Sequence, residues 1–237
     1  MIVVALLVVV LCASAVIAML ASRLPAESEP ALLGYPLRGD GSPDRTAFLP
    51  LLGAWDTRAR AIDWPRAGTD IGLVLICGLA IWRHGLGLDA LRGIVLASFL
   101  LLVLRIDWQH HLIFLITIMP GTVVALLFAL WDSPSALLES VAAMVIAGVT
   151  FLLLFLVGIA VFRVRALGMG DIWLAAMIGA MTGFAALSAL MLGMFLAAGG
   201  AIFLIATRQR GRKDFLPYGA YLCCGAIIIV VLRTTGL

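Results

Sequence analysis

Charged residues are scarce in this chain of 237 residues. Only 12% of the residues are charged and 64% are hydrophobic, whereas soluble domains are roughly half apolar. The charges gather in short segments between long uncharged runs, and each run approaches the ~20 residues that a helix needs to cross a bilayer. This scarcity excludes an ordinary soluble domain and indicates an integral membrane protein.

Paired cysteines are also lacking. The four cysteines all lie in apolar runs, and none forms the CxxC spacing of a structural zinc site: Cys12, Cys77, Cys223 and Cys224. We therefore expect neither a metal site nor a disulfide framework. The net charge of +3 gives no indication of nucleic acid as a partner, because the position of the charges matters more here than their sum.

Two further features are missing. Residues 1–21 form an apolar run without the basic segment that opens a secretory signal, so we interpret the run as a retained helix. The long runs do not alternate between apolar and polar residues as barrel strands do. Residues 141–162, for example, are apolar on every face, which favours helices.

The uncharged runs predict an all-α fold, a polytopic membrane bundle of about eight transmembrane helices. The block at 172–207 is too long for one helix, and we expect a tight turn near Thr182 and Gly183 to divide it. The predicted spans are 2–20, 68–83, 87–105, 110–131, 137–162, 171–183, 185–207 and 216–235.

Lysine and arginine predict the orientation, because these residues are retained on the cytoplasmic side. With eight spans and the N-terminus outside, the outer segments hold only Arg83, Arg92 and Arg233 of the 16 basic residues. The inner segments hold the others, which are Arg23, Arg38, Arg45, Arg58, Arg60, Arg66, Arg105, Arg163, Arg165, Arg208, Arg210, Arg212 and Lys213. Both termini are therefore expected outside.

Two aspartates differ from the other acidic residues. Asp107 and Asp171 each stand directly before a long apolar run, on the predicted cytoplasmic side. An ionisable group that enters hydrocarbon costs several kcal/mol unless it is paired or hydrated, so such a position is a functional hypothesis. The alternative is helix capping, in which the carboxylate binds the free N–H groups at the start of the following helix.

The residues around Asp171 favour a function. Gly168 and Gly170 permit a close backbone approach that a plain cap does not need. If Asp107 and Asp171 lie together on neighbouring helices, they share a proton, and the site then holds an acid and a base. The base activates water for attack on a peptide carbonyl, and the acid donates to the developing oxyanion.

Several segments resemble the type IV prepilin peptidases, membrane aspartic peptidases that remove leader peptides from pilin-like precursors. Gly168-Met169-Gly170-Asp171 is similar to the GxGD motif of the family, and Asp107 resembles its first catalytic aspartate. Residues 215–219 are similar to a late Pro-Phe-Gly-Pro stretch, and residues 13–25 resemble the N-terminal segment of the long members. The resemblance implies an enzyme of the bacterial inner membrane, with periplasmic termini and an active site that faces the cytoplasm.

The resemblance also implies a division of the chain and a set of partners. Residues 1–83 would comprise the first span, a cytoplasmic loop (22–69) and the second span, and residues 84–237 the membrane core that carries the GxGD motif. The substrates implied are pilin precursors or the pseudopilin precursors of type II secretion. These have a basic leader that is followed by an apolar helix in the lipid bilayer.

The chain departs from the family pattern in its cofactor-related segment. Long members bind zinc through two CxxC pairs in the first loop, but residues 22–69 contain no cysteine, so zinc is not expected. Those members also methylate the new N-terminus with S-adenosylmethionine, and this activity stays open here. Trp173 stands where the family usually has lysine, and Leu112-Ile113-Phe114-Leu115 stands where Ile-Pro-Asp/Asn is common.

Four residues are weaker candidates for an accessory role. Asp70 begins the second predicted span, where it either holds substrate or caps the helix. His110 follows Asp107 within one turn and either tunes that acid or is simply solvated. Pro217 and Gly219 belong to the late motif of the family.

Two other functions fit some of these features. Paired membrane acids also serve ion pathways, so a proton-coupled transporter is one alternative, although the sequence has no convincing inverted repeat. The second alternative is a non-catalytic scaffold for assembly of a pilus or secretion system, which the departures in the first loop suggest.

Overall fold

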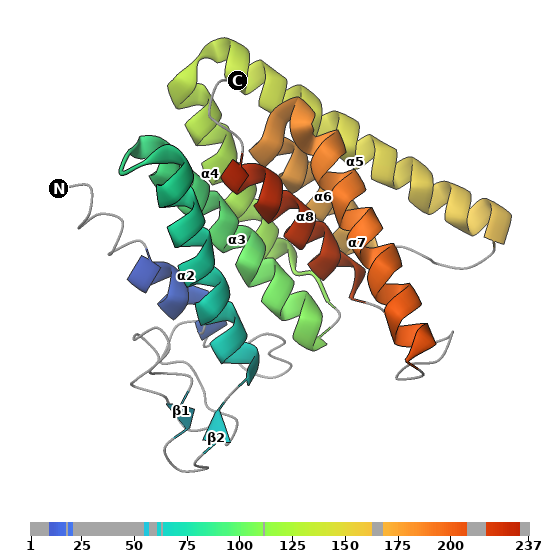
Figure 1. Ribbon diagram of the computed structural model, residues 1–237. Coiled ribbons are helices and arrows are strands. Elements are labelled where there is room, and N and C mark those ends of the chain that lie inside the picture. Colours follow the sequence, from blue (N-terminus) through green and yellow to red (C-terminus); the bar gives the residue numbers. More distant parts are fainter. Residues whose placement is uncertain are drawn as a thin grey trace.

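The computed structural model is a bundle of helices (Figure 1). It describes residues 10–17, 19–20, 55–56, 61–62, 64–110, 112–162, 168–207 and 217–232. Residues 10–17 and 19–20 are helical. The longer elements are α2 (Trp64–His84), α3 (Leu88–His110), α4 (Leu115–Asp132), α5 (Pro134–Phe162), α6 (Met169–Thr182), α7 (Ala186–Ala206) and α8 (Tyr218–Leu232).

The prediction of a helical bundle is confirmed, and each predicted span overlaps a helix within the residues that the structure describes. One small addition is an antiparallel pair of two-residue strands, β1 (Trp55–Asp56) and β2 (Ala61–Ile62), in the predicted first loop. Within the described residues, 3 segments are long and apolar enough to cross a membrane, which are Leu115–Asp132, Pro134–Val161 and Met169–Leu204. The number of eight spans and the location of the termini stay predictions.

The turn between α6 and α7 lies where the uncharged block predicted it. Gly183 has a φ of 55°, a left-handed conformation that glycine adopts without steric cost, and its N–H binds the carbonyl of Gly179. A short 3₁₀ segment, η3 (Gly183–Ala185), leads into α7. The two helices therefore form a hairpin.

The boundary between α3 and α4 was predicted wrongly. We expected a helix to end at residue 105 and Asp107 to precede the next one, because charged residues are rarely found inside a span. Instead α3 continues to His110, residues 112–114 are not helical, and α4 begins at Leu115. The helix can include Asp107 because a distant part of the chain, α8, binds the carboxylate.

The centre of the bundle is built from α3, α6 and α8. The contacts are most extensive between α5 and α6, between α3 and α8, and between α7 and α8. The main core consists of apolar side chains from α3 to α8, among which Leu100, Val103, Leu174, Ile178 and Leu222 are almost fully buried. In contrast, α5 runs along one side of the bundle (Figure 1) and exposes large apolar side chains, as a lipid-facing helix does.

The two ends of the bundle can be told apart by their contacts. At one end α3 finishes and α4, α6 and α8 begin, since Asp107 binds α8 and Ile113 packs against Gly170 of α6. At the other end α3 begins and α4 finishes, with Arg92 bound to Asp132. There His84, the last residue of α2, also makes a 3.0 Å hydrogen bond to the carbonyl of Val231 in α8. We call these ends the aspartate end and the opposite end.

Candidate active site

Asp107 lies in the last turn of α3 and is 4% exposed. Its Oδ2 accepts a 2.7 Å hydrogen bond from the backbone N–H of Ala220, 113 residues away. Ala220 is in the first turn of α8, where the backbone N–H groups have no partner within the helix and the helix dipole favours negative charge. Asp107 is therefore a cap, as the alternative interpretation held, but it caps α8 and not the helix that follows it in sequence.

Asp171 lies in the first turn of α6 and is 8% exposed. Its Oδ2 accepts a 2.8 Å hydrogen bond from the N–H of Gly168, while its own N–H donates to the Gly168 carbonyl at 3.1 Å. Asp171 thus caps its own helix. A cap alone does not require burial, however, and a buried carboxylate loses much of its hydration. Capping alone therefore does not explain why the Asp171 carboxyl group is buried, and a second role for this group is consistent with its position.

One apolar side chain, that of Ile113, packs against both helix starts that bind the two aspartates. A β-carbon built on Gly170 would lie 2.7 Å from the Ile113 β-carbon. A β-carbon built on Gly219 would lie 2.7 Å from Ile113 Cδ1 and 3.0 Å from Asp107 Oδ2. Ile113 therefore touches the starts of both α6 and α8. The carboxyl groups of Asp107 and Asp171 are close enough for their charges to interact.

The predicted motif glycines have distinct positions. Gly168 is exposed and supplies the N–H that binds Asp171, whereas Gly170 is half-buried against Ile113. Pro217 is buried directly before α8, and Gly219 lies beside Asp107 in the first turn of that helix. The late motif therefore builds the wall of the site that faces Asp107.

Asp70 lies in a second polar cluster. Its Oδ1 accepts a 2.9 Å hydrogen bond from the Ser14 hydroxyl, and both residues are buried. Beside it, Arg105 donates a 2.7 Å hydrogen bond to the Thr69 hydroxyl and joins α3 to α2. These contacts favour a structural role for Asp70. His110 is the last residue of α3, but its side chain lies outside the described part of the structure.

Three residues of the site were not singled out from the sequence. Ile113 fills the space between the helix starts, and Tyr218, the half-buried first residue of α8, interacts electrostatically with Asp171. Cys223, fully buried, lies one turn further along α8 within range of both aspartates. The only signal for Tyr218 was its place in the late motif. The sequence marked Ile113 only as part of a segment that departs from the family pattern, and Cys223 only as a cysteine in an apolar run.

Among the described residues, no group of three or more His, Cys, Asp or Glu side chains is arranged to hold a metal ion. Most of the first loop, residues 22–69, lies outside the described residues. The expectations about zinc and S-adenosylmethionine therefore stay predictions.

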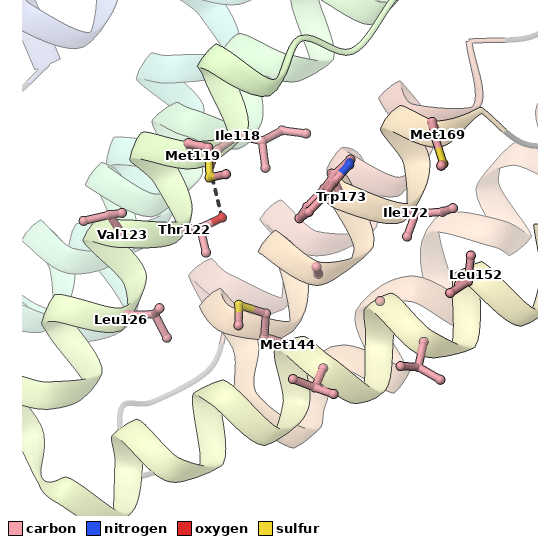
Figure 2. Close-up of a pocket in the computed structure, with 14 residues that line it drawn as sticks. Ile118, Met119, Thr122, Val123, Leu126, Met144, Leu152, Met169, Ile172 and Trp173 are labelled. Carbon is pink, nitrogen blue, oxygen red and sulfur yellow. Dashed lines mark hydrogen bonds between the residues drawn. The ribbon is translucent and has the colours of Figure 1, made fainter.

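An apolar groove runs along the bundle between α4, α5 and α6 (Figure 2). It has a volume of about 660 Å³, and only one side chain in its lining, Thr122, carries a hydroxyl. That hydroxyl is bound to the Ile118 carbonyl of the same helix at 3.0 Å. The lining residues are Ile118, Met119, Thr122, Val123, Leu126, Met144, Val145, Gly148, Val149, Leu152, Met169, Ile172, Trp173 and Ala176.

The groove and the aspartates lie on opposite sides of α6. Met169, Ile172, Trp173 and Ala176 follow the spacing of one helix face, and they line the groove. Asp171 is rotated by about half a turn from that face at 3.6 residues per turn. The groove begins in the same first turn of α6 that carries Asp171.

Residues 94–207 match the model of the type IV leader peptidase family. This range contains Asp107, Asp171, Ile113 and all residues of the apolar groove, and it ends before α8. No curated protein and no solved structure matches the chain.

Proposed function

Because this chain belongs to the type IV leader peptidase family through residues 94–207, we propose that it is an aspartic endopeptidase with Asp107 and Asp171 as its catalytic pair. The observation that carries the proposal is a pair of buried carboxyl groups, Asp171 in the first turn of α6 and Asp107 from the end of α3, each bound by an N–H group at a helix start that packs against Ile113. Two neighbouring carboxyl groups in a poorly solvated site do not both ionise readily, so one supplies a base and the other an acid.

The proposed reaction uses water as the nucleophile. The ionised carboxylate takes a proton from water as the water oxygen attacks the carbonyl carbon of the scissile peptide. The protonated carboxyl group donates its proton to the carbonyl oxygen, which gives a neutral tetrahedral intermediate. When the C–N bond breaks, the leaving nitrogen takes the proton from the protonated carboxyl group. One hydroxyl of the intermediate gives its proton to the other carboxylate as the carbonyl re-forms, so the pair returns to one carboxyl group and one carboxylate.

The helix starts support this chemistry. The N–H groups of Gly168 and Ala220 bind the two carboxyl groups at 2.8 and 2.7 Å and fix their orientation before substrate arrives. Preorganised groups need no rearrangement when charge develops in the transition state, and such groups often contribute most to rate enhancement. Each aspartate is thus a helix cap and a member of the proposed catalytic pair.

The apolar groove supports a substrate with an apolar helix. A groove between lipid-facing helices, lined almost entirely by hydrocarbon, suits a transmembrane segment better than a polar peptide. Such a segment would leave the groove at the start of α6, where Asp171 lies. We therefore propose that pilin-like or pseudopilin precursors are cleaved where the leader meets the apolar helix, on the cytoplasmic side of the bacterial inner membrane.

The test is cleavage of a designed precursor with a lysine-rich leader and an apolar leucine and alanine helix, in detergent micelles, with products identified by mass spectrometry. Asp107→Asn and Asp171→Asn should each abolish cleavage and leave membrane insertion intact. Asp132→Asn, a change of the same type at the opposite end, is the matched control and should cleave normally. Near-normal cleavage by Asp107→Asn or Asp171→Asn would overturn the catalytic pair.

The same assay separates the other functions. A scaffold would leave the precursor intact in the wild-type protein, and a transporter would do so while moving protons across liposomes. Addition of S-adenosylmethionine tests the methylation that the family resemblance implies, because a methylated product is heavier by one methyl group. Methylation is independent of the proposal for cleavage.

A further inference from the structure

Ile113 packs against both helix starts that bind the aspartates. It lies in the non-helical segment between α3 and α4, is half-buried, and packs against the main core. Its side chain fills the space beside Gly170 in front of α6 and beside Gly219 in front of α8.

The space between the two helix starts is small. With 2.7 Å between Ile113 and the position of an added β-carbon at either Gly170 or Gly219, not even one methyl group fits without movement, since carbon atoms in contact are normally about 3.5–4.0 Å apart. Because residues 170 and 219 are glycines, the backbone of α6 and of α8 packs directly against Ile113 with no side chain between them. The size of residue 113 therefore determines how much room this part of the site has.

A peptide that reacts at the aspartates has to enter this space. General acid and base catalysis requires hydrogen-bond reach, directly or through one water, between the reacting atoms and both carboxyl groups. Asp107 Oδ2 is itself only 3.0 Å from the position of an added β-carbon at Gly219, the same position that Ile113 approaches. The side chain next to the scissile bond therefore contacts Ile113.

We propose that Ile113 is a specificity-determining residue that limits the size of the substrate side chain next to the scissile bond. The inference rests on the proposed peptidase function and deepens it. Ile113 carries no group that takes part in proton transfer, so its effect is on which substrates fit. A smaller residue at position 113 admits larger substrate side chains, and a larger residue excludes more of them.

The test compares designed precursors that differ at one residue next to the scissile bond, which is Gly, Ala, Val or Leu. Pairs of precursors compete in one reaction, and mass spectrometry gives the ratio of their kcat/KM values. Because both compete for the same enzyme molecules, the ratio does not depend on how much of a variant is folded. Wild type should discriminate against Leu, and Ile113→Ala, which removes three carbon atoms, should raise the Leu-to-Gly ratio at least about ten-fold, because even one methylene group in an apolar pocket changes discrimination by that factor.

Two further variants sharpen the result. Ile113→Val removes only Cδ1 and should give an intermediate ratio, whereas Ile113→Phe should lower it below that of wild type. Leu112→Ala, an exposed neighbour in the same segment, is the matched control and should leave the ratio unchanged. An unchanged ratio in Ile113→Ala, with wild type cleaving at least one precursor, would overturn the inference and leave the proposed function standing. Failure of wild type to cleave any precursor would overturn both.

Discussion

The acidic residues at the two ends of the bundle have different surroundings. At the opposite end, the Asp132 side chain is 42% exposed and pairs with Arg92 across α3 and α4, and Glu139 accepts a 3.2 Å hydrogen bond from the N–H of Phe184. At the aspartate end, Asp107 and Asp171 are only 4% and 8% exposed and bind backbone N–H groups at helix starts. An exposed ion pair contributes little, whereas a buried carboxylate is costly and needs a compensating role.

The difference shows that the environment, and not the residue type, separates structural acids from candidate catalytic ones. At the aspartate end, glycine lets three segments close around the carboxyl groups. At the opposite end, exposed Trp82 and Trp131 are typical of side chains at a membrane interface. The predictions below test this comparison, beginning with the largest expected effect.

Gly219→Ala should damage the aspartate end most. The new β-carbon would lie 2.7 Å from Ile113 Cδ1 and 3.0 Å from Asp107 Oδ2, so Asp107 or α8 has to shift. Displacement of a catalytic group by about 1 Å can cost on the order of 100-fold in rate, and we expect a loss of this size in kcat/KM for the designed precursor.

Gly78→Ala is the matched control for Gly219→Ala. Gly78 is also in a helix, α2, but a β-carbon added there meets nothing within 4 Å. The exchange should leave cleavage unchanged. If Gly219→Ala also retained full activity, close packing would not distinguish the aspartate end.

Val149→Trp should impair cleavage of long substrates by filling the apolar groove, which Val149 lines from α5. We expect KM for the full precursor to rise about ten-fold, which is the effect of losing the apolar contact of about one methylene group. A short peptide that spans the cleavage site but lacks the apolar helix should be cleaved as in wild type.

Leu153→Trp is the control for Val149→Trp, because Leu153 is exposed on the same helix but does not line the groove. It should leave KM unchanged for both substrates. Equal effects of Val149→Trp on the precursor and on the short peptide would argue against binding of the apolar helix in the groove.

Much of the fold could be predicted from the sequence, because a helix that crosses a membrane leaves a long uncharged run. The runs located each described helix and the α6–α7 turn at Gly183. The α3–α4 boundary was missed because Asp107 was assumed to stand outside a helix. Its hydrogen bond to Ala220 joins residues 113 positions apart, and no local pattern carries that information.

The candidate site was predictable in part for the same reason. Gly168 and Gly170 drew attention to Asp171 because glycine spacing is a local signal. Ile113 gave no such signal, since an isoleucine in an apolar chain is ordinary until the fold places it between two helix starts. The groove likewise depends on side chains from three helices, and only their packing reveals it.

Asp70→Ala tests whether a buried acidic residue at the aspartate end is needed for cleavage merely because it is buried there. Asp70 is 4% exposed, like Asp107, but it accepts a hydrogen bond from Ser14. Removal of the carboxylate leaves the buried Ser14 hydroxyl without this acceptor, which costs about 1–3 kcal/mol. Thermal unfolding in detergent should show this loss, while the folded fraction should cleave the precursor at the wild-type rate. A loss of kcat in fully folded protein would instead move Asp70 into the catalytic machinery.

Arg92→Ala should have the smallest effect, because it breaks the Arg92–Asp132 pair at the opposite end. The Asp132 side chain is 42% exposed, so solvent screens the pair and we expect a loss of roughly 0.2–1 kcal/mol in the free energy of unfolding. Arg92 also lies 5.6 Å from the centre of the Phe128 ring, and loss of that contact adds to the effect. Arg92→Lys retains the charge without the planar group, so it separates the two contributions. Neither variant should change cleavage. A clear loss of activity in Arg92→Ala would mean that the two ends are coupled through α3 and α4. The Arg92–Asp132 pair would then contribute to activity and would not be purely structural.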